Sequence, residues 1–259
     1  MKHLKDLLVT DVAFLRDDYV LISLSDPDGA MPECLPGQFV ELAVEGSPTT
    51  FLRRPISINW CDVKDNRLDL LIHIIGDGTR ALSRLRKGDT LNTLFPLGNG
   101  FSVPADGKPR KILLVGGGVG TAPMLNYGKV LREAGHEPVF LLGGRSAKDI
   151  LQLDRFEQIG RVYVTTEDAT LGERGFVTNH SVLANETFDG IAACGPKPMM
   201  KAVAAFARQH GVNCEVSLEN MMACGLGACL CCVEKTVRGN VCVCKEGPVF
   251  NINDLTWFD

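Results

Sequence analysis

The chain has 259 residues, of which 45% are hydrophobic and 22% charged, an ordinary globular composition that excludes a disordered chain. Its 27 basic and 31 acidic side chains leave a net charge of −4, so nothing in the charge favours nucleic acid or an anionic membrane as a partner. Ten cysteines are the unusual count, and six of them fall within residues 224–244. So local a cluster indicates a metal or redox device rather than a disulfide framework.

The start of the chain bears on its compartment. Residues 1–18 lack an apolar stretch long enough for a signal peptide, because Asp6 and Asp11 interrupt them. No window approaches 18 uncharged apolar residues, so no membrane span is expected. We therefore expect a cytoplasmic protein whose thiols stay reduced.

Residues 1–103 consist of short β-like runs separated by turn residues. The clearest runs cover residues 19–24, 38–44 and 68–75. Apolar residues occupy both faces of the last run, so we expect it to be buried on both sides. Short strands with regular turns predict a small antiparallel β-barrel.

A linker rich in proline, glycine and charged residues covers 103–110. The rest of the region 104–212 alternates between strands and helices. Strands are expected at 111–115, 138–142, 161–165 and 190–193, and helices at 122–134 and 197–209. Gly135 and Gly211 stand where each helix should stop. The alternation predicts a parallel α/β domain with helices on both faces of the sheet, followed by a small Cys- and Gly-rich segment at 213–259.

The cysteine cluster is the strongest chemical signal. Cys224-x4-Cys229-x2-Cys232, followed by Cys244, has the spacing of a plant-type two-iron, two-sulfur (2Fe-2S) cluster. Glycines between the first two cysteines permit the unusual backbone dihedrals that a loop wrapped around such a cluster needs.

Two other interpretations of these cysteines remain open. One is a structural zinc site formed by Cys229, Cys232, Cys242 and Cys244, and the other is a set of buried free thiols. In the iron–sulfur interpretation Cys231 and Cys242 are not ligands, and we expect them to pack as neighbours.

A glycine-rich turn follows the first strand of the α/β domain and opens its first helix, the context of a dinucleotide-binding loop. Its residues are Gly116, Gly117, Gly118, Gly120 and Thr121. The motif Cys194-Gly195-Pro196 ends a later parallel strand, where ligands of such sheets bind. A tight turn without a ligand is the alternative.

The barrel half contains the run Leu52–Ile58. An arginine in a strand can pair with a diphosphate through two hydrogen bonds, and Arg54 is placed for this role. Ser57 lies near enough in sequence to reach a flavin ring nitrogen. Alternatively, Arg53 and Arg54 are a solvated edge.

A second motif follows in the barrel half. Gly78 and Thr79 are expected to open a short helix over residues 79–86, with Thr79 as its N-cap, whose free N–H groups would hold the same diphosphate. His73 precedes this motif. A histidine in this position is more often a core or edge residue with its hydrogen bonds satisfied than a catalytic residue.

Together these motifs resemble the ferredoxin reductase-like superfamily over nearly the whole chain. Its flavin signature R-x-[YFP]-[ST] is matched by Arg54–Ser57, its glycine-rich loop by Gly116–Thr121 and its C-G-P motif by Cys194–Pro196. The segments Met222–Cys232 and Val243–Phe250 are similar to one family in particular, the electron transfer subunits of dihydroorotate dehydrogenase B.

The resemblance implies an FAD-binding barrel at 1–103, an NAD-binding domain at 104–212 and a 2Fe-2S segment at 213–259. It implies flavin contacts at Arg54, Pro55, Ile56, Ser57, Leu71, Ile72, His73, Gly78 and Thr79. The implied cluster ligands are Cys224, Cys229, Cys232 and Cys244, and the nicotinamide lies near Cys194.

The resemblance also implies a partner. A catalytic subunit with FMN would oxidise dihydroorotate in pyrimidine (UMP) biosynthesis, in a heterotetramer, and this chain would supply electron transfer but no catalytic residue. A subunit of an NAD(P)H:ferredoxin or sulfide-linked oxidoreductase is the alternative, and a metal-bound regulatory or sensor protein is a third.

Two further points stay open. NAD is chosen over NADP from the resemblance alone. Arg145 and Ser146 follow the second parallel strand, where the 2′ position of the nucleotide is read, and these residue types suit the 2′-phosphate of NADP. The remaining cysteines, Cys34, Cys61 and Cys214, are expected to pack in the core.

Overall fold

The structure is a computed structural model, and it describes residues 1–258. The chain divides into two compact units. Unit 1 comprises Met1–Gly100, Asn220–Glu234 and Asn240–Pro248, and unit 2 comprises Phe101–Glu219, Lys235–Gly239 and Val249–Asp259. The Cys-rich C-terminal part of the chain therefore contributes to both units.

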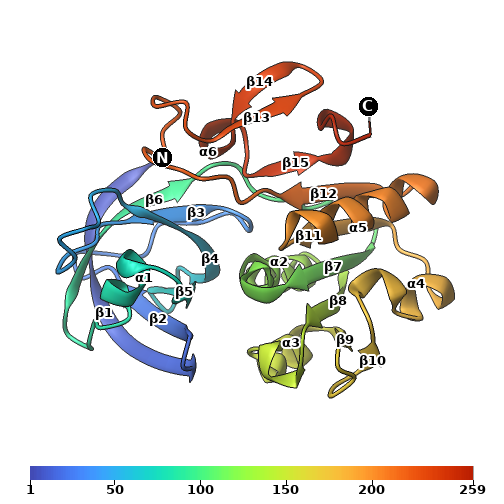
Figure 1. Cartoon of the computed structure of the whole chain (residues 1–259), viewed down its shortest axis with the longest axis horizontal. Helices are drawn as coiled ribbons and strands as arrows, with labels where there is room; N and C mark the ends of the chain where they lie inside the picture. Colours follow the sequence, from blue (N-terminus) through green and yellow to red (C-terminus); the bar gives the residue numbers. More distant parts are fainter. Residues whose placement is uncertain (259) are drawn as a thin grey trace. The chain divides into compact units, whose positions relative to one another are not determined.

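Unit 1 is built on a closed antiparallel barrel, as predicted (Figure 1). Its strands are β1 (His3–Arg16), β2 (Tyr19–Ser25), β3 (Phe39–Leu42), β4 (Arg54–Asp62), β5 (Arg67–His73) and β6 (Thr90–Leu97). They close in the order β1-β2-β5-β4-β3-β6. The short helix α1 (Asp77–Leu82) follows β5.

Strand β5 is buried on both sides, which confirms the expectation for this run. Leu70 and Ile72 belong to the barrel core and are fully buried, while Leu71 is only 1% exposed on the opposite face. The strand ends at His73, two residues earlier than predicted, and Ile75 is 72% exposed. The backbone N–H of Ile74 donates instead to the carbonyl of Asp18.

Unit 2 is a seven-stranded sheet in the order β10-β9-β8-β7-β11-β12-β15. Its strands are β7 (Lys111–Gly117), β8 (Glu137–Gly144), β9 (Arg161–Thr166), β10 (Glu173–Arg174), β11 (Gly190–Cys194), β12 (Asn213–Ser217) and β15 (Val249–Asn251). All neighbours pair in parallel except β15, which runs antiparallel to β12. The predicted parallel sheet is confirmed, and the chain's C-terminal part adds its antiparallel edge.

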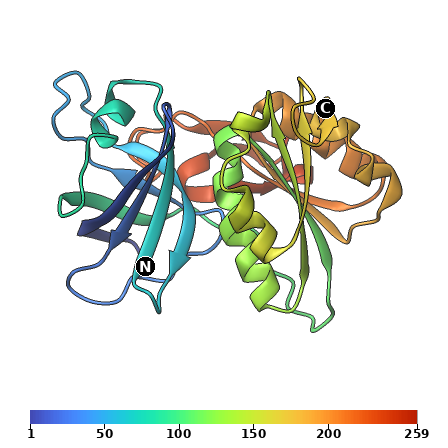
Figure 2. The ribbon, with the colours of Figure 1, turned by 90° about the horizontal axis from the view of Figure 1, so that it is seen from below.

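The helices of unit 2 cover both faces of this sheet (Figure 2). They are η1 (Gly118–Thr121), α2 (Ala122–Glu133), η2 (Ala147–Asp149), α3 (Leu153–Ile159), η3 (Val177–Asn179), α4 (Val182–Asn185) and α5 (Lys197–Gln209). The glycine stops of α2 and α5 are confirmed, because Gly135 and Gly211 have φ of +84° and +66°. Only glycine adopts this left-handed conformation at little cost.

The rest of the C-terminal part forms β13 (Val233–Thr236), β14 (Gly239–Cys242), α6 (Val243–Glu246) and η4 (Ile252–Asp254). Strands β13 and β14 pair in a small sheet of their own. In the part of the chain that the structure describes, no helix is both long and apolar enough to cross a bilayer.

Candidate cofactor sites

Backbone N–H groups point at three of the four predicted cluster thiols. Gly227 N–H donates to Cys244 Sγ at 3.1 Å, and Cys244 N–H donates to Cys232 Sγ at 3.3 Å. Leu226 N–H lies 3.4 Å from Cys224 Sγ. Such donors stabilise thiolate sulfur, as a loop wrapped around an iron–sulfur cluster must.

The thiols differ in how readily they ionise. The hydrogen bond from the Leu226 N–H lowers the pKa of Cys224 to about 6, because its effect on the pKa is larger than the opposing effect of partial burial. Burial and the adjacent Cys232 thiol raise the pKa of Cys244 to about 12. Cys229 is exposed. A metal bound here would displace the remaining protons, because coordinated thiols are deprotonated.

The zinc interpretation makes a different demand on these thiols from the iron–sulfur interpretation. Within residues 1–258, no group of three or more His, Cys, Asp or Glu side chains surrounds a single ion position. A structural zinc needs four ligands within about 2.3 Å of one ion, whereas a 2Fe-2S cluster distributes its four thiolates over two irons. The N–H donors at these thiols are those that a loop around a 2Fe-2S cluster provides.

The remaining two cysteines of this region, Cys231 and Cys242, differ in burial. Cys242 is half-buried, with its Sγ 3.8 Å from the carbonyl oxygen of Gly227. Cys231 is exposed, so the expectation that it packs is wrong. Cys34, Cys61 and Cys214 are buried as expected.

Arg54 and Ser57 of the flavin motif both have free bonding capacity. The Arg54 guanidinium donates only to the carbonyls of Leu52 and Arg53, at 3.0 and 3.1 Å, and has no carboxylate partner among residues 1–258. The Ser57 hydroxyl likewise has no partner in the described chain, and Pro55 and Ile56 between them are half-buried. A diphosphate and a ring nitrogen would satisfy these groups.

Arg53 is part of the barrel, contrary to the alternative of a solvated edge. Its guanidinium donates to the main-chain carbonyls of Glu41 and Asn92 at 3.2 and 3.1 Å, and also to the Asn92 side chain. The two neighbouring arginines therefore have different tasks, one structural and one open to a ligand.

Thr79 is not an N-cap, and α1 does not extend to residue 86. The helix begins at Asp77 with Gly76 as its N-cap, and it ends at Leu82. The Thr79 hydroxyl accepts the N–H groups of Ile75 and Gly76 at 3.0 and 3.1 Å, so it closes the turn before the helix.

Gly78 lies beside Arg54. A Cβ at Gly78 would come within 2.6 Å of Arg54 Nε, so only glycine leaves the guanidinium in place. The structure thus brings together two predicted flavin residues that are far apart in sequence.

The strand residues predicted to contact flavin are less open. Leu71 and Ile72 bury their side chains, so only their backbone could meet a ligand. The His73 ring stacks on Tyr19 with centroids 4.4 Å apart, and its Nε2 lies 3.5 Å from Asp18 Oδ2. These contacts give His73 a structural role in the barrel.

The glycine-rich loop is packed too tightly for side chains. A Cβ at Gly116 would lie 2.9 Å from Thr121 Cα, and one at Gly120 would lie 2.4 Å from the Cys194 carbonyl oxygen. The loop therefore adjoins Cys194 and Gly195 at the carboxyl end of β11, where a nucleotide is expected.

Cys194 has a neighbour that the sequence did not reveal. Its buried Sγ lies 3.8 Å from Oε1 of Glu219. Burial, and then the charge of Glu219, raises the pKa of the Cys194 thiol far above its ordinary value. Glu219 lies shortly before Cys224 in the chain, but no motif marked it.

The residues after β8 also differ from expectation. Ser146 donates its N–H and hydroxyl to Asp149 Oδ2 at 2.8 and 3.1 Å, while Arg145 is exposed. Ser146, one of the two residues considered for a 2′-phosphate, therefore bonds to a carboxylate instead.

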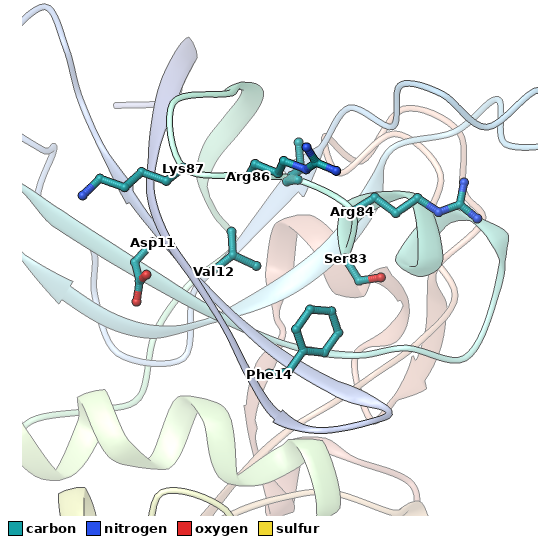
Figure 3. Close-up of a pocket in the computed structure, with 8 residues that line it drawn as sticks. Asp11, Val12, Phe14, Ser83, Arg84, Arg86 and Lys87 are labelled. Carbon is teal, nitrogen blue, oxygen red and sulfur yellow. The ribbon is translucent and has the colours of Figure 1, made fainter.

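A surface cavity of about 480 Å³ lies elsewhere on unit 1 (Figure 3). Its lining residues are Asp11, Val12, Phe14, Ser83, Arg84, Leu85, Arg86 and Lys87. Arg84 and Lys87 extend in opposite directions, so the polar groups do not converge on one ligand position. The predicted cofactor residues are not among them, and we place no cofactor in this cavity.

Two family models match the chain. The iron-sulfur cluster binding domain of dihydroorotate dehydrogenase B matches residues 219–256. The oxidoreductase NAD-binding domain matches residues 114–205. The first covers all the predicted cluster ligands, and the second covers the glycine-rich loop and Cys194.

A solved structure described as a study of the NADH-dependent reduced ferredoxin-NADP oxidoreductase matches with a TM-score of 0.86 and 28% identity. The match covers 97% of this chain and 90% of that one. The ferredoxin reductase in carbazole 1,9a-dioxygenase shares the fold, with a TM-score of 0.67, 24% identity, and coverage of 82% and 67%.

Relatives with closer sequences cover most of the chain. The dihydroorotate dehydrogenase B (NAD(+)) electron transfer subunit of Fusobacterium nucleatum subsp. nucleatum is 36% identical over 230 residues, 86% of this chain and 88% of that protein. Its counterpart in Listeria monocytogenes serovar 1/2a is 40% identical over 223 residues, 85% and 87% of the two chains. The chain therefore belongs to the family of dihydroorotate dehydrogenase B electron transfer subunits, oxidoreductases whose cofactors are an iron–sulfur cluster, FAD and NAD.

Proposed function

We propose that the chain takes electrons from a catalytic partner subunit that holds FMN and oxidises dihydroorotate, and delivers them to NAD in pyrimidine biosynthesis. The observation that carries this proposal is the place of the cluster thiols. Cys224, Cys232 and Cys244 belong to the same compact unit as the flavin-motif strand β4. A one-electron centre and a flavin held by one unit are what an electron transfer subunit requires.

Each motif has a proposed role. The thiolates of Cys224, Cys229, Cys232 and Cys244 would hold the two irons. Arg54 would bind the FAD diphosphate, and the Ser57 hydroxyl would bond to the flavin ring. When bound, FAD supplies chemistry that links one-electron transfer at the cluster to hydride transfer with NAD.

The nucleotide loop would hold NAD at the other end of this route. The packed turn Gly116–Thr121 brings N–H groups close to a pyrophosphate, and α2 begins directly after it. Asp149, which lies beside Ser146 after β8, supports NAD over NADP, because a carboxylate there disfavours a 2′-phosphate.

The carbon chemistry would belong to the partner, since we assign no residue of this chain as a base for dihydroorotate. The test compares the chain alone with the chain co-expressed with an FMN-containing catalytic subunit. We expect the chain alone to reduce dyes with NADH and to leave dihydroorotate untouched. The purified complex, a heterotetramer by size, should reduce NAD with dihydroorotate. Turnover of dihydroorotate by the chain alone would contradict the proposal.

A second candidate is a subunit of an NAD(P)H:ferredoxin or sulfide-linked oxidoreductase. It is favoured by the likeness to the reduced ferredoxin-NADP oxidoreductase structure, which covers 97% of the chain. Rates with NADH and NADPH, each measured with ferredoxin as acceptor, separate the two. A strong preference for NADPH with rapid ferredoxin reduction would favour this second candidate.

A further inference from the structure

Glu41 is an anomaly in the barrel of unit 1. Its side chain on β3 is fully buried, with 0% exposure. Neither of its carboxylate oxygens has a hydrogen-bond partner in the chain up to residue 258. Burying a carboxyl without partners is unfavourable, so its place in the fold needs a reason.

The Glu41 side chain lies directly against the predicted cluster loop. A Cβ on Gly225 would be 2.7 Å from Cγ of Glu41 and 3.1 Å from its Oε1. Gly225 immediately follows Cys224 and has a φ of +65°, a conformation that suits glycine. The contact lies within unit 1, whose loop and barrel form one compact body.

The flavin motif lies on the strand that pairs with that of Glu41. Strands β3 and β4 pair so that Glu41 faces Pro55 and Leu42 faces Arg54. Glu41 thus lies beside the strand of the proposed flavin residues and packs against the proposed cluster loop.

The charged groups around Glu41 leave its carboxyl without a bonded cation. Arg53 donates to the main-chain carbonyl of Glu41 and not to its carboxyl. Burial, opposed by the positive charges of Arg53 and Arg54 and assisted by the Cys224 thiolate, raises the pKa of Glu41 to about 7. The register partner of Glu41 on β6 is the uncharged Leu94, and the next pair along is Leu42 with Thr93.

We propose that Glu41 is a positioning residue that lowers the reduction potential of the proposed cluster by placing a carboxylate against its loop. The proposal rests on the proposed cluster. Reduction adds one electron and one negative charge to the cluster, and the ionised carboxylate of Glu41, in a poorly solvated place nearby, opposes that addition. Glu41 forms and breaks no bond in this step.

The test is an anaerobic redox titration of the purified protein at pH 9, followed by the electron paramagnetic resonance signal of the reduced cluster. In Glu41→Gln, we expect the equilibrium constant for cluster reduction to rise about tenfold, which is about 59 mV for a one-electron couple. Glu41→Asp keeps the charge and should stay within about threefold of the wild type.

Glu45→Gln is the matched control, because it makes the same change on an exposed side chain just beyond β3. It should leave the potential unchanged. Glu41→Met, a second neutral variant of similar length, should shift the potential in the same direction as Glu41→Gln and keeps the test decisive if one variant fails to fold.

Equal potentials in wild type and the neutral variants, with equal iron and sulfide contents, would overturn the role of Glu41 and leave the proposed cluster intact. A wild-type protein that holds no iron and sulfide would instead remove the proposed cluster, and this inference with it.

Discussion

The backbone N–H of Gly227 donates a hydrogen bond to Sγ of Cys244, 3.1 Å away and 17 positions later in the chain. The bond connects the first cluster loop to the last predicted ligand. Gly227 has a φ of +82°, and a Cβ there would lie 3.0 Å from Lys245 Cδ. The backbone conformation therefore favours glycine, and the exposed Lys245 side chain would have to shift slightly for any larger residue.

We expect Gly227→Ala to lower the iron and sulfide content. A non-glycine residue in the left-handed region costs roughly 1–2 kcal/mol, enough to weaken cluster retention about tenfold. Metal analysis and the visible absorption of the purified protein measure the loss. Gly239→Ala is the control, because Gly239 also has positive φ but open space around it. Equal iron contents in both variants would argue against a role of the loop geometry.

Replacing Arg53 and replacing Arg54 by glutamine should have different effects on FAD binding and on stability. Arg54→Gln removes a free charged donor, so we expect FAD to dissociate about 10- to 100-fold more readily while stability changes by less than about 0.5 kcal/mol. Arg53→Gln removes bonds to Glu41 and Asn92 and should lower the free energy of unfolding by about 1–3 kcal/mol. Flavin titration and denaturant unfolding make the comparison. The opposite pairing of effects would refute this assignment.

The fold was predictable because its signals are local. The helices α2 and α5 follow apolar spacing and end at Gly135 and Gly211, close to where the sequence placed them. The apolar run of β5 gave its burial on both faces. The antiparallel edge strand β15 was not predictable in the same way, since its partner β12 lies more than 30 residues earlier and no local pattern links the two.

The site was predictable only where spacing encodes chemistry. The cysteine spacing and the glycine-rich loop can be recognised from the sequence alone. The iron–sulfur family model covers the cysteines, and the NAD-binding family model covers the loop. Glu41 and Glu219 gain their neighbours Gly225 and Cys194 through tertiary contacts alone. Thr79 was misplaced because the N-cap of α1 is Gly76, which has no capping side chain to mark it in the sequence.

Cys194→Ser should slow NADH-dependent dye reduction about tenfold without loss of FAD. The thiol lies at the carboxyl end of β11, and small displacements of a bound ring there carry a large kinetic cost. Cys214→Ser is the control, since Cys214 is also buried on a neighbouring strand, where its Sγ lies 4.0 Å from the carbonyl oxygen of Glu215. Steady-state rates in the two variants, with flavin content measured in parallel, decide the matter. Equal rates would remove Cys194 from the nicotinamide site.

His180 should make unit 2 sensitive to mild acid. Its ring is buried, its Nδ1 accepts the N–H of Val182 at 3.0 Å, and burial, opposed by the charge of Glu173, lowers its pKa. Because the unfolded chain then binds a proton more readily than the folded one, this contribution to stability is present above the unfolded pKa of 6.5 and is lost as the pH falls below it.

The corresponding experiment is denaturant unfolding of the wild type and His180→Asn at pH 7.5, 6.5 and 5.5. Asparagine can still accept the Val182 N–H but cannot be protonated, so the free energy of unfolding should fall less steeply with acid in the variant. Other groups titrate in this range in both proteins, so the difference between the two slopes isolates His180. Parallel slopes would mean that His180 is protonated as easily in the folded chain as in the unfolded one.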